Sequence, residues 1–323
     1  QAEDGIRDVE RSRGLGDVYK RQLLPLTLIV KQVKPEVKVV LHLHNYQPLT
    51  YTSVLLANKR PNLAMDLIVE LGEHRSLNRA IVTGLLHPLN RVNVLALYHA
   101  DLVICVSREQ SKILNTYIPF IKNKAIIVYN PPPLMPNILK ELSEEPIIMY
   151  VGGDSFIKGF DILLRVLPFL NRFNVLFYII GDLSLRGLRF LKRSLNKCRV
   201  RVLGKISHDE VLRLHSRTWA LLFPSLSEEP MPYSIIEACL AGTLPIASRV
   251  GGIKELLSDV PEVLPYMFNP YSIEDIKRAI NALMSTSPNQ VLDIGYKLRN
   301  RIMKILERSR LIFKRTMERV LYL

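Results

Sequence analysis

Short apolar runs rich in β-branched residues recur along the second half of the chain, and a helix-like stretch follows each of them. The runs cover residues 147–151, 175–180, 200–203, 220–223 and 244–247. Continuous apolar runs of this length, bounded by turns, are typical of strands buried on both faces of a parallel sheet. The alternation predicts an α/β architecture with helices on both faces, in which ligands bind beyond the carboxyl ends of the strands.

The first half of the chain alternates in the same way. Strands are predicted at 37–41, 102–106 and 125–128, and helices at 23–32, about 53–71 and about 77–98. Ser107 directly follows the second strand and is a favourable N-cap for the next helix. Four prolines within residues 131–136 then favour an extended connection, which we interpret as the boundary between two domains.

Residues 1–22 have no helical or strand period, mix Gly, Asp and Arg, and do not begin with Met. Their sequence resembles a translated sequencing-library adapter. A natural disordered arm is the alternative, but we favour a non-native origin and exclude the segment from the predicted fold. We then expect the native protein to begin upstream, so that the first strand of the N-terminal domain is missing here.

The composition narrows the classes of function. With 44 Lys and Arg against 30 Asp and Glu, the net charge of +14 attracts nucleic acid, anionic lipid or phosphorylated ligands. No zinc-finger, RNP or helix-turn-helix motif accompanies this charge, so we expect no nucleic acid partner. Cys105, Cys198 and Cys239 lie far apart without metal-ligand spacing, which predicts reduced thiols in a cytoplasmic protein and no zinc site. No apolar run approaches the ~20 residues that span a bilayer.

Five loops with glycines or carboxylates follow the predicted strands of the second half. The first runs from Gly152 to Gly159 and contains Lys158, and a glycine-rich turn before a helix favours bound phosphate. The other four contain Gly181-Asp182, Gly204-Lys205-Ile206, Glu229 to Glu237, and Gly251-Gly252. Each loop alone is a weak signal, because most such turns bind nothing. Their common place at one edge of a parallel sheet favours a shared binding site.

Glu237 carries the strongest individual signal. It lies within the apolar helical sequence Ile235-Ile236-Glu237-Ala238, where a charge is costly to bury unless a polar group meets it. Glu229 lies in the proline-rich loop before this helix, and seven residues separate it from Glu237. We infer that Glu237 has a role beyond folding.

The order of these motifs resembles the C-terminal, nucleotide-sugar-binding domain of retaining glycosyltransferases of family four, which have the GT-B fold. The resemblance is strong over residues 147–257 and runs through all five loops. It is weaker over residues 37–131, where Leu41-His42-Leu43-His44-Asn45 and Val128-Tyr129-Asn130-Pro131 are similar to the family's acceptor domain. The ordered set is specific, although no single motif is.

The resemblance implies an α/β protein with two Rossmann-like domains whose parallel sheets face a cleft, the first domain being incomplete. Residues 23–136 would form the acceptor-side domain and residues 137–300 the nucleotide-sugar-binding domain. Residues 301–323 would form a basic helix that packs back towards the first domain. Apolar residues at helical spacing favour this packing, while the basic residues also favour a helix on a membrane surface. Both interpretations stay open.

The resemblance also implies roles for individual residues. Lys158 would stabilise the leaving nucleoside diphosphate, Glu229 would face the sugar or the reacting centre, and Glu237 would accept hydrogen bonds from ribose hydroxyls. Fixed cations and helix N-termini suit the negative charge of the leaving group. The nucleotide-diphosphate sugar is then a co-substrate, and no metal or other cofactor is expected. Further donor contacts would come from Gly152, Gly153, Gly181, Gly204, Ile206, Met231 and Pro232.

Two features of the predicted site need separate treatment. The family usually has Arg where this chain has Gly153, so phosphate binding would depend on Lys158, backbone amides or another cation such as Arg186 or Arg249. His42 and His44, two apart on a strand, would point to the same face. We slightly favour His44 as a catalytic residue of the acceptor cleft over a histidine with a purely structural role.

The predicted function is transfer of a hexosyl group, with retention, from a nucleotide-diphosphate sugar to a hydroxyl of a glycan, a lipid-linked or a small-molecule acceptor. A same-face displacement is favoured because no nucleophile pair is evident. The alternatives are a nucleotide-sugar epimerase with the same fold and a non-catalytic basic protein that binds membranes or polyanions. A cytoplasmic location is expected, with peripheral association to the inner face of an anionic membrane as a further hypothesis.

Overall fold

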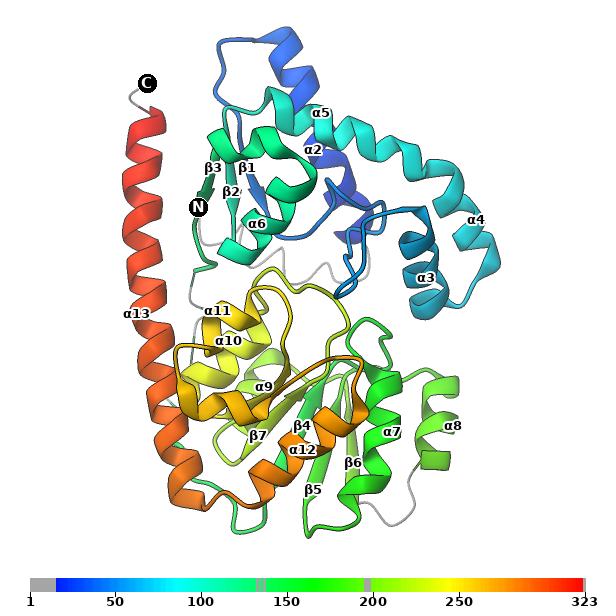
Figure 1. Ribbon diagram of the computed structural model, residues 1–323, viewed down its shortest axis with the longest axis vertical. Coiled ribbons are helices and arrows are strands. Elements are labelled where there is room, and N and C mark those ends of the chain that lie inside the picture. Colours follow the sequence, from blue (N-terminus) through cyan, green and yellow to red (C-terminus); the bar gives the residue numbers. More distant parts are fainter. Residues whose placement is uncertain (1–15, 132, 134, 136–137, 195–198, 322–323) are drawn as a thin grey trace.

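The computed structural model describes residues 16–131, 133, 135, 138–194 and 199–321, and it contains two stacked α/β layers with a long helix along one side (Figure 1). All strand pairs in both sheets are parallel, which confirms the predicted fold class. The smaller sheet has the order β1-β2-β3 and the larger one β6-β5-β4-β7-β8-β9.

The smaller sheet belongs to the first half of the chain. Its strands are β1 (Val40–Leu43), β2 (Leu102–Cys105) and β3 (Ala125–Ile127). Its helices are α2 (Gly16–Val33), α3 (Leu63–His74), α4 (Leu77–Leu86), α5 (Asn90–His99) and α6 (Arg108–Tyr117), with short 3-10 helices η1 (His87–Leu89) and η2 (Pro119–Asn123). Ser107 caps α6 as predicted, because its hydroxyl accepts a hydrogen bond from the backbone N–H of Gln110.

The structure corrects the sequence prediction at four places in this half. The helix predicted at about 77–98 is divided into α4 and α5 by η1. The helix predicted from residue 53 begins only at Leu63, because Asn62 accepts a hydrogen bond from the N–H of Met65 and so fixes the N-terminus of α3. The strand predicted at 37–41 lies at 40–43. Residues 16–22, predicted to lack a helical period, are part of α2. The rest of the segment predicted to be non-native, residues 1–15, lies outside the described residues.

The larger sheet follows the predicted strand pattern closely. Its strands are β4 (Ile147–Val151), β5 (Leu176–Ile180), β6 (Arg199–Gly204), β7 (Ala220–Phe223), β8 (Leu244–Ser248) and β9 (Met267–Phe268), of which only β9 was not predicted. The accompanying helices are α7 (Phe160–Leu170), α8 (Leu185–Ser194), α9 (His208–Leu214), α10 (Tyr233–Leu240), α11 (Ile253–Leu257), η3 (Pro261–Tyr266), α12 (Ile273–Met284) and α13 (Pro288–Leu321).

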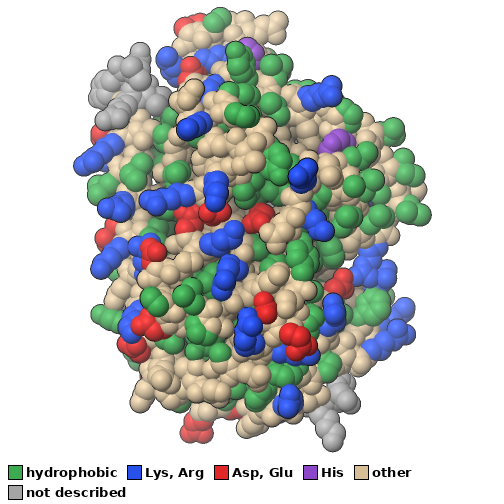
Figure 2. All heavy atoms as spheres, in the orientation of Figure 1, with side chains coloured by type: hydrophobic (Ala, Val, Ile, Leu, Met, Phe, Trp, Pro, Cys, Tyr) green, Lys and Arg blue, Asp and Glu red, His purple; other side chains and the backbone are tan. Residues whose placement is uncertain are grey.

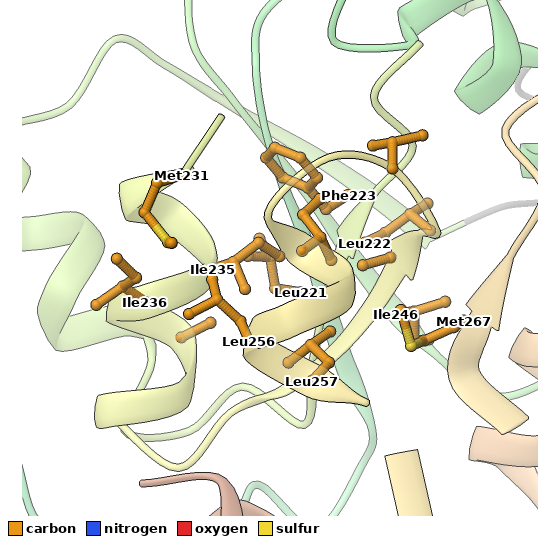
Figure 3. Packing of buried hydrophobic residues seen from close by; sticks show 14 of the residues in the cluster. Leu221, Leu222, Phe223, Met231, Ile235, Ile236, Ile246, Leu256, Leu257 and Met267 are labelled. Atoms are coloured by element: carbon orange, nitrogen blue, oxygen red, sulfur yellow. The ribbon is translucent and has the colours of Figure 1, made fainter. Parts of the chain in front are cut away.

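The core of this domain explains why its strands are mostly apolar, apart from the exposed edge strand β6, which contains Arg199 and Arg201. Figure 3 shows side chains of β7 packed with Ile235 of α10 and with Leu256 and Leu257 of α11. Leu221 and Ile235 have no exposed surface. Since helices cover both faces of the sheet, neither side of a strand needs polar residues.

Helix α13 joins the two layers. Its side chains Leu298, Ile302 and Leu306 are buried, and the Ser309 hydroxyl donates a hydrogen bond to the carbonyl of Tyr129, 3.2 Å away. Through this hydrogen bond α13 contacts the segment that follows β3 of the smaller sheet. The helix continues without a break across the division predicted at residue 300.

A partly buried lysine anchors the connection between the two sheets. Lys140 donates hydrogen bonds to the carbonyls of His215 and Thr218, both at 2.5 Å, and to the hydroxyl of Thr243 at 2.7 Å. No carboxylate faces this ammonium group among the contacts of the described residues. Burial lowers the pKa of Lys140 to about 7.

This burial predicts an unusual pH dependence of stability. Because the pKa of Lys140 is near 7 in the folded protein and ~10.4 in the unfolded chain, the unfolded state binds more protons between these values, and stability should rise with pH. We expect the difference in unfolding free energy between wild type and Lys140→Met to move in favour of wild type by about 1 kcal/mol per pH unit from pH 7 to 10. Chemical denaturation at several pH values measures it. A difference that stays constant with pH would contradict the prediction.

Candidate functional site

A cavity with a volume of about 1410 Å³ lies at the carboxyl edge of the larger sheet. Four of the five loops predicted to converge contribute to its wall, namely those after β4, β5, β6 and β7. The smaller domain, which contains the sheet β1-β2-β3, supplies Glu73, His74 and Arg75 at the end of α3. The cavity is therefore an interdomain cleft at the position where α/β sheets bind ligands.

Lys158 and Glu229 form an ion pair in this cleft. The Lys158 ammonium donates to the Glu229 carboxylate at 2.9 Å, and the hydroxyls of Ser225 and Ser227 donate to the same oxygen at 2.8 and 3.1 Å. Burial raises the pKa of Glu229, but the Lys158 charge and the three hydrogen bonds outweigh it, so the pKa lies below its usual value. Glu229 is therefore an ionised carboxylate with a cation beside it.

Glu237 has the polar partner that its apolar helix requires. Its carboxylate lies 2.8 Å from Nε2 of His208, and both residues line the cleft. The Glu237 side chain is 11% exposed and that of His208 is 41% exposed. Sequence reasoning missed His208, although its position in the loop after β6 was a signal that could have included it.

The cleft offers several groups that favour an anion. Tyr233 and Ser234, in the first turn of α10, line it, and the N-terminus of a helix attracts negative charge. Arg186 and Lys205 also line the cleft, together with Arg75 from the other layer. Arg249, the other cation that we considered for the site, is not among the lining residues.

The structure explains why glycine occupies position 153. Gly153 has φ = +57°, a conformation that residues with a side chain rarely adopt. A Cβ atom there would lie 2.3 Å from the carbonyl oxygen of Asp182, so this turn has no room for an Arg. The cations that line the cleft besides Lys158 therefore come from other segments of the chain.

The fifth loop supports the Glu229 loop from behind and does not line the cleft. The N–H groups of Gly251 and Gly252 donate to the Glu228 carboxylate at 2.6 Å and to the Glu229 carbonyl at 2.8 Å. A Cβ atom on Gly251 would lie 2.1 Å from the Glu229 carbonyl oxygen. The fifth loop thus meets the Glu229 loop at this edge of the sheet, and close backbone packing explains its glycines.

The Glu229 loop is also bonded to the smaller domain. Residues 55–57 pair with 226–228 through an isolated antiparallel bridge between Leu56 and Ser227. The N–H of Ala57 donates to the carbonyl of Leu226 at 2.8 Å, and the N–H of Glu228 donates to the carbonyl of Leu55 at 2.7 Å. Both sides of the cleft thus fix the loop that carries Glu229.

Three predicted site residues lie outside the cleft wall, whereas the other eight line it. Met231 is buried, and its carbonyl accepts a hydrogen bond from Asn130 at 3.2 Å. The carbonyl of Gly204 accepts from the N–H of Gly181 at 2.8 Å. His44 follows β1 with its ring 4.2 Å from that of His42, as expected of two residues on one face. The lining residues among those predicted are Gly152, Gly153, Lys158, Gly181, Ile206, Glu229, Pro232 and Glu237.

Metal-ligating residues do not gather in the part of the chain that the structure describes. No group of three or more His, Cys, Asp or Glu side chains there is arranged to hold a metal ion. Cys105 and Cys239 are buried free thiols, and Cys198 lies outside the described residues. Independence from metals stays a prediction.

Comparison with protein families gives a match to the glycosyl transferases group 1, over residues 134–304 of 323. Among curated relatives, a subunit of phosphatidylinositol N-acetylglucosaminyltransferase from Arabidopsis thaliana is 28% identical over 246 residues, 73% of this chain and 54% of the relative. The chain therefore spans about half the length of this relative.

Comparison with solved structures supports the GT-B fold. Sucrose-phosphate synthase of Thermosynechococcus elongatus matches with a TM-score of 0.68 and 18% identity, over 92% of this chain and 71% of its own. HepE of Anabaena, solved with UDP and glucose, matches with a TM-score of 0.62 and 17% identity, over 91% and 76% of the two chains. At these identities the matches show the fold alone.

Proposed function

Because the chain belongs to the glycosyl transferases group 1 family, we propose that it transfers a hexosyl group from a nucleoside-diphosphate sugar to a hydroxyl acceptor. The observation that carries the proposal is that two carboxylates in one interdomain cleft each contact a nitrogen-bearing side chain. The pairs are Lys158 with Glu229 and His208 with Glu237. A UDP-sugar is the first donor to test, since HepE was solved with UDP and glucose.

In this proposal the two pairs bind different parts of the donor. Lys158 and the N-terminus of α10 stabilise the negative charge that develops on the leaving diphosphate as the glycosyl bond breaks. Arg186, Lys205 or Arg75 supplies the second cation that the turn at Gly153 cannot hold. Glu237 accepts hydrogen bonds from the ribose hydroxyls, with its carboxylate oriented by His208.

Glu229 faces the sugar and stabilises the positive charge that builds near the anomeric carbon. Transfer then occurs with retention, the acceptor hydroxyl attacking from the face that the diphosphate leaves. His44 stays a candidate for the acceptor side. A lipid-linked acceptor is favoured, because the Arabidopsis relative is named for transfer to phosphatidylinositol. A cytoplasmic location, at the inner face of a membrane, completes the proposal.

Release of nucleoside diphosphate from UDP-, GDP- and ADP-sugars tests the proposed function. We expect one donor to be consumed faster when an acceptor lipid extract is added, and equally in the presence of EDTA. Conversion of the donor to its epimer without release of nucleoside diphosphate would support the epimerase alternative. Absence of both donor binding and turnover would favour a non-catalytic protein.

Replacing His208 tests the orientation of Glu237. A hydrogen bond to a charged group contributes about 1–3 kcal/mol, and the lower end applies here because His208 is 41% exposed. We expect His208→Ala to raise KM for the donor about five- to tenfold while kcat changes less than twofold. His208→Gln, which keeps an N–H donor, should restore most of the affinity. A lower KM in His208→Ala would show that His208 competes with the donor and would contradict the proposal.

A further inference from the structure

Helix α4 carries its bulky apolar side chains on the side that faces water. Its buried residues are Ala80 and Thr83, whereas Leu77, Ile81 and Leu85 are 71%, 61% and 75% exposed. The exposed residues recur every fourth position and so form one stripe along the helix. A helix on the surface of a globular domain normally points such a stripe towards the core. In α4, by contrast, the small and polar residues face the core and the bulky apolar stripe faces solvent.

The exposed stripe continues onto the neighbouring helices. Ile68 and Leu71 of α3 and Leu95 and Tyr98 of α5 are exposed as well, and α3 packs against α4. Figure 2 shows hydrophobic side chains gathered over this part of the smaller domain, at the upper right. Single exposed apolar residues are ordinary, but a contiguous patch marks an interaction surface. We call the exposed apolar side chains of α3, α4 and α5 the α3–α5 face.

We propose that the α3–α5 face docks on the surface of an anionic membrane, with the helices lying in the plane of the headgroups. Residues 77–99 include Arg79, Arg91, His87 and His99 but no Asp or Glu. Arg79 and His87 contact the carboxylates of Glu70 and Asp66 on α3, but both acidic side chains are buried, whereas Arg79 and Arg91 are exposed. An apolar stripe whose exposed charged neighbours are arginines matches a bilayer that carries negative lipids. Exposed Tyr98 fits the interface, where an aromatic ring has one apolar and one polar side. The chain's net charge of +14 disfavours a second copy of the same chain as the occupant.

The structure fits docking of this face on the membrane surface better than a bilayer-spanning helix formed by residues 77–99. By length and composition the 23 residues Leu77–His99 could span a bilayer, a stretch that the sequence analysis did not anticipate. However, η1 with Pro88 interrupts the segment. On its inner side, Asn93 donates a hydrogen bond to the carbonyl of Gln47, and Leu97 is completely buried. Crossing would expose this packed side to lipid and leave the polar groups unpaired.

The α3–α5 face adjoins the cleft. Glu73, His74 and Arg75 line the cleft, and Ser76 directly after them is the N-cap of α4. A domain docked through this face holds the mouth of the cleft close to the headgroup layer. This last step rests on the proposed function, and it gives a lipid-linked acceptor a short path to the donor.

Sedimentation of the full chain with vesicles tests the docking surface. Vesicles of phosphatidylcholine with a quarter phosphatidylglycerol are compared with vesicles of phosphatidylcholine alone. We expect Ile81→Ser/Leu85→Ser to weaken binding to the anionic vesicles tenfold or more. Both positions are mostly exposed, so the variant should fold, and circular dichroism checks this. The matched control is Leu311→Ser/Phe313→Ser, which removes exposed apolar residues of α13 and should bind as wild type does.

The assay uses no sugar donor, so its result tests the docking proposal separately from the proposed transferase activity. Equal binding of wild type and Ile81→Ser/Leu85→Ser would overturn the proposal, as would loss of binding in the α13 variant alone. Sedimentation equilibrium without lipid tests the alternative that a second copy of the chain covers the α3–α5 face. A wild-type dimer that becomes monomeric in Ile81→Ser/Leu85→Ser, without any change in vesicle binding, would assign the face to a second copy and overturn membrane docking.

Discussion

Lys158→Ala is expected to lower kcat about 10²- to 10³-fold, which corresponds to about 3–4 kcal/mol of transition-state stabilisation. Lys158 is the cation in direct contact with the Glu229 carboxylate, and it lies in the loop where the leaving diphosphate would bind. Negative charge grows on that group as the glycosyl bond breaks, so a fixed ammonium stabilises the transition state more than the bound donor. Steady-state kinetics with the preferred donor measure the loss, and KM should rise much less than kcat falls.

A matched control substitution distinguishes a loss of catalysis from a loss of folding stability. Lys277→Ala also removes a lysine paired with a glutamate, Glu274 at 2.7 Å, but on the surface of α12. Its turnover should stay within twofold of wild type. Lys158→Ala also leaves Glu229 without its cation, which we expect to cost about 1–2 kcal/mol of folding stability, a modest value because Lys158 is 34% exposed. If turnover falls only in proportion to the unfolded fraction, Lys158 has no catalytic role.

Five of the six strands of the larger sheet, all but β9, could be predicted within about two residues of their bounds. Burial between helices favours a continuous apolar sequence, and a glycine or proline often follows it. The polar residues at the strand ends could be predicted for the same reason, since parallel strands bring their carboxyl ends to one edge. Lys158 and Glu237, 79 positions apart, line one cleft as a consequence of this topology.

Features that depend on contacts between distant segments could not be predicted. Nothing in the sequence shows that residues 55–57 pair with 226–228, since neither segment has a strand period of its own. The histidine at position 208 looks like an ordinary first residue of a capped helix until the fold brings it to Glu237. The period of α4 predicts a helix, but a period does not tell which face is buried, and here the face with Ala80 is the inner one.

Glu228 and Glu229 are adjacent in the sequence, but their side chains have different partners in the structure. Glu229 points to Lys158 in the cleft, whereas Glu228 accepts hydrogen bonds from the N–H groups of Gly251 and Asn58. Glu228 is not among the residues that line the cleft. Glu228 holds the loop in place, whereas Glu229 lines the cleft.

Glu229→Gln is therefore expected to lower kcat about 10²- to 10³-fold with little change in donor affinity. The amide keeps the shape of the side chain and removes the charge that would stabilise a positive anomeric centre. Because the pKa of Glu229 is held below its usual value, the wild-type carboxylate stays ionised at neutral and mildly acidic pH. The stabilisation from its ion pair is present above the pKa of an unfolded glutamate, ~4.3, and is lost as the pH falls through the lower folded value.

Glu228→Gln is the matched control, because it changes the same functional group one position earlier in the chain. We expect its kcat to stay within about tenfold of wild type and its melting temperature to fall, since a neutral amide accepts weaker hydrogen bonds from Gly251 and Asn58. The opposite ranking of the two variants in kcat would place the reacting centre next to Glu228. In that case the loop would have to move when the donor binds, and the bridge between Leu56 and Ser227 would be the contact that opens.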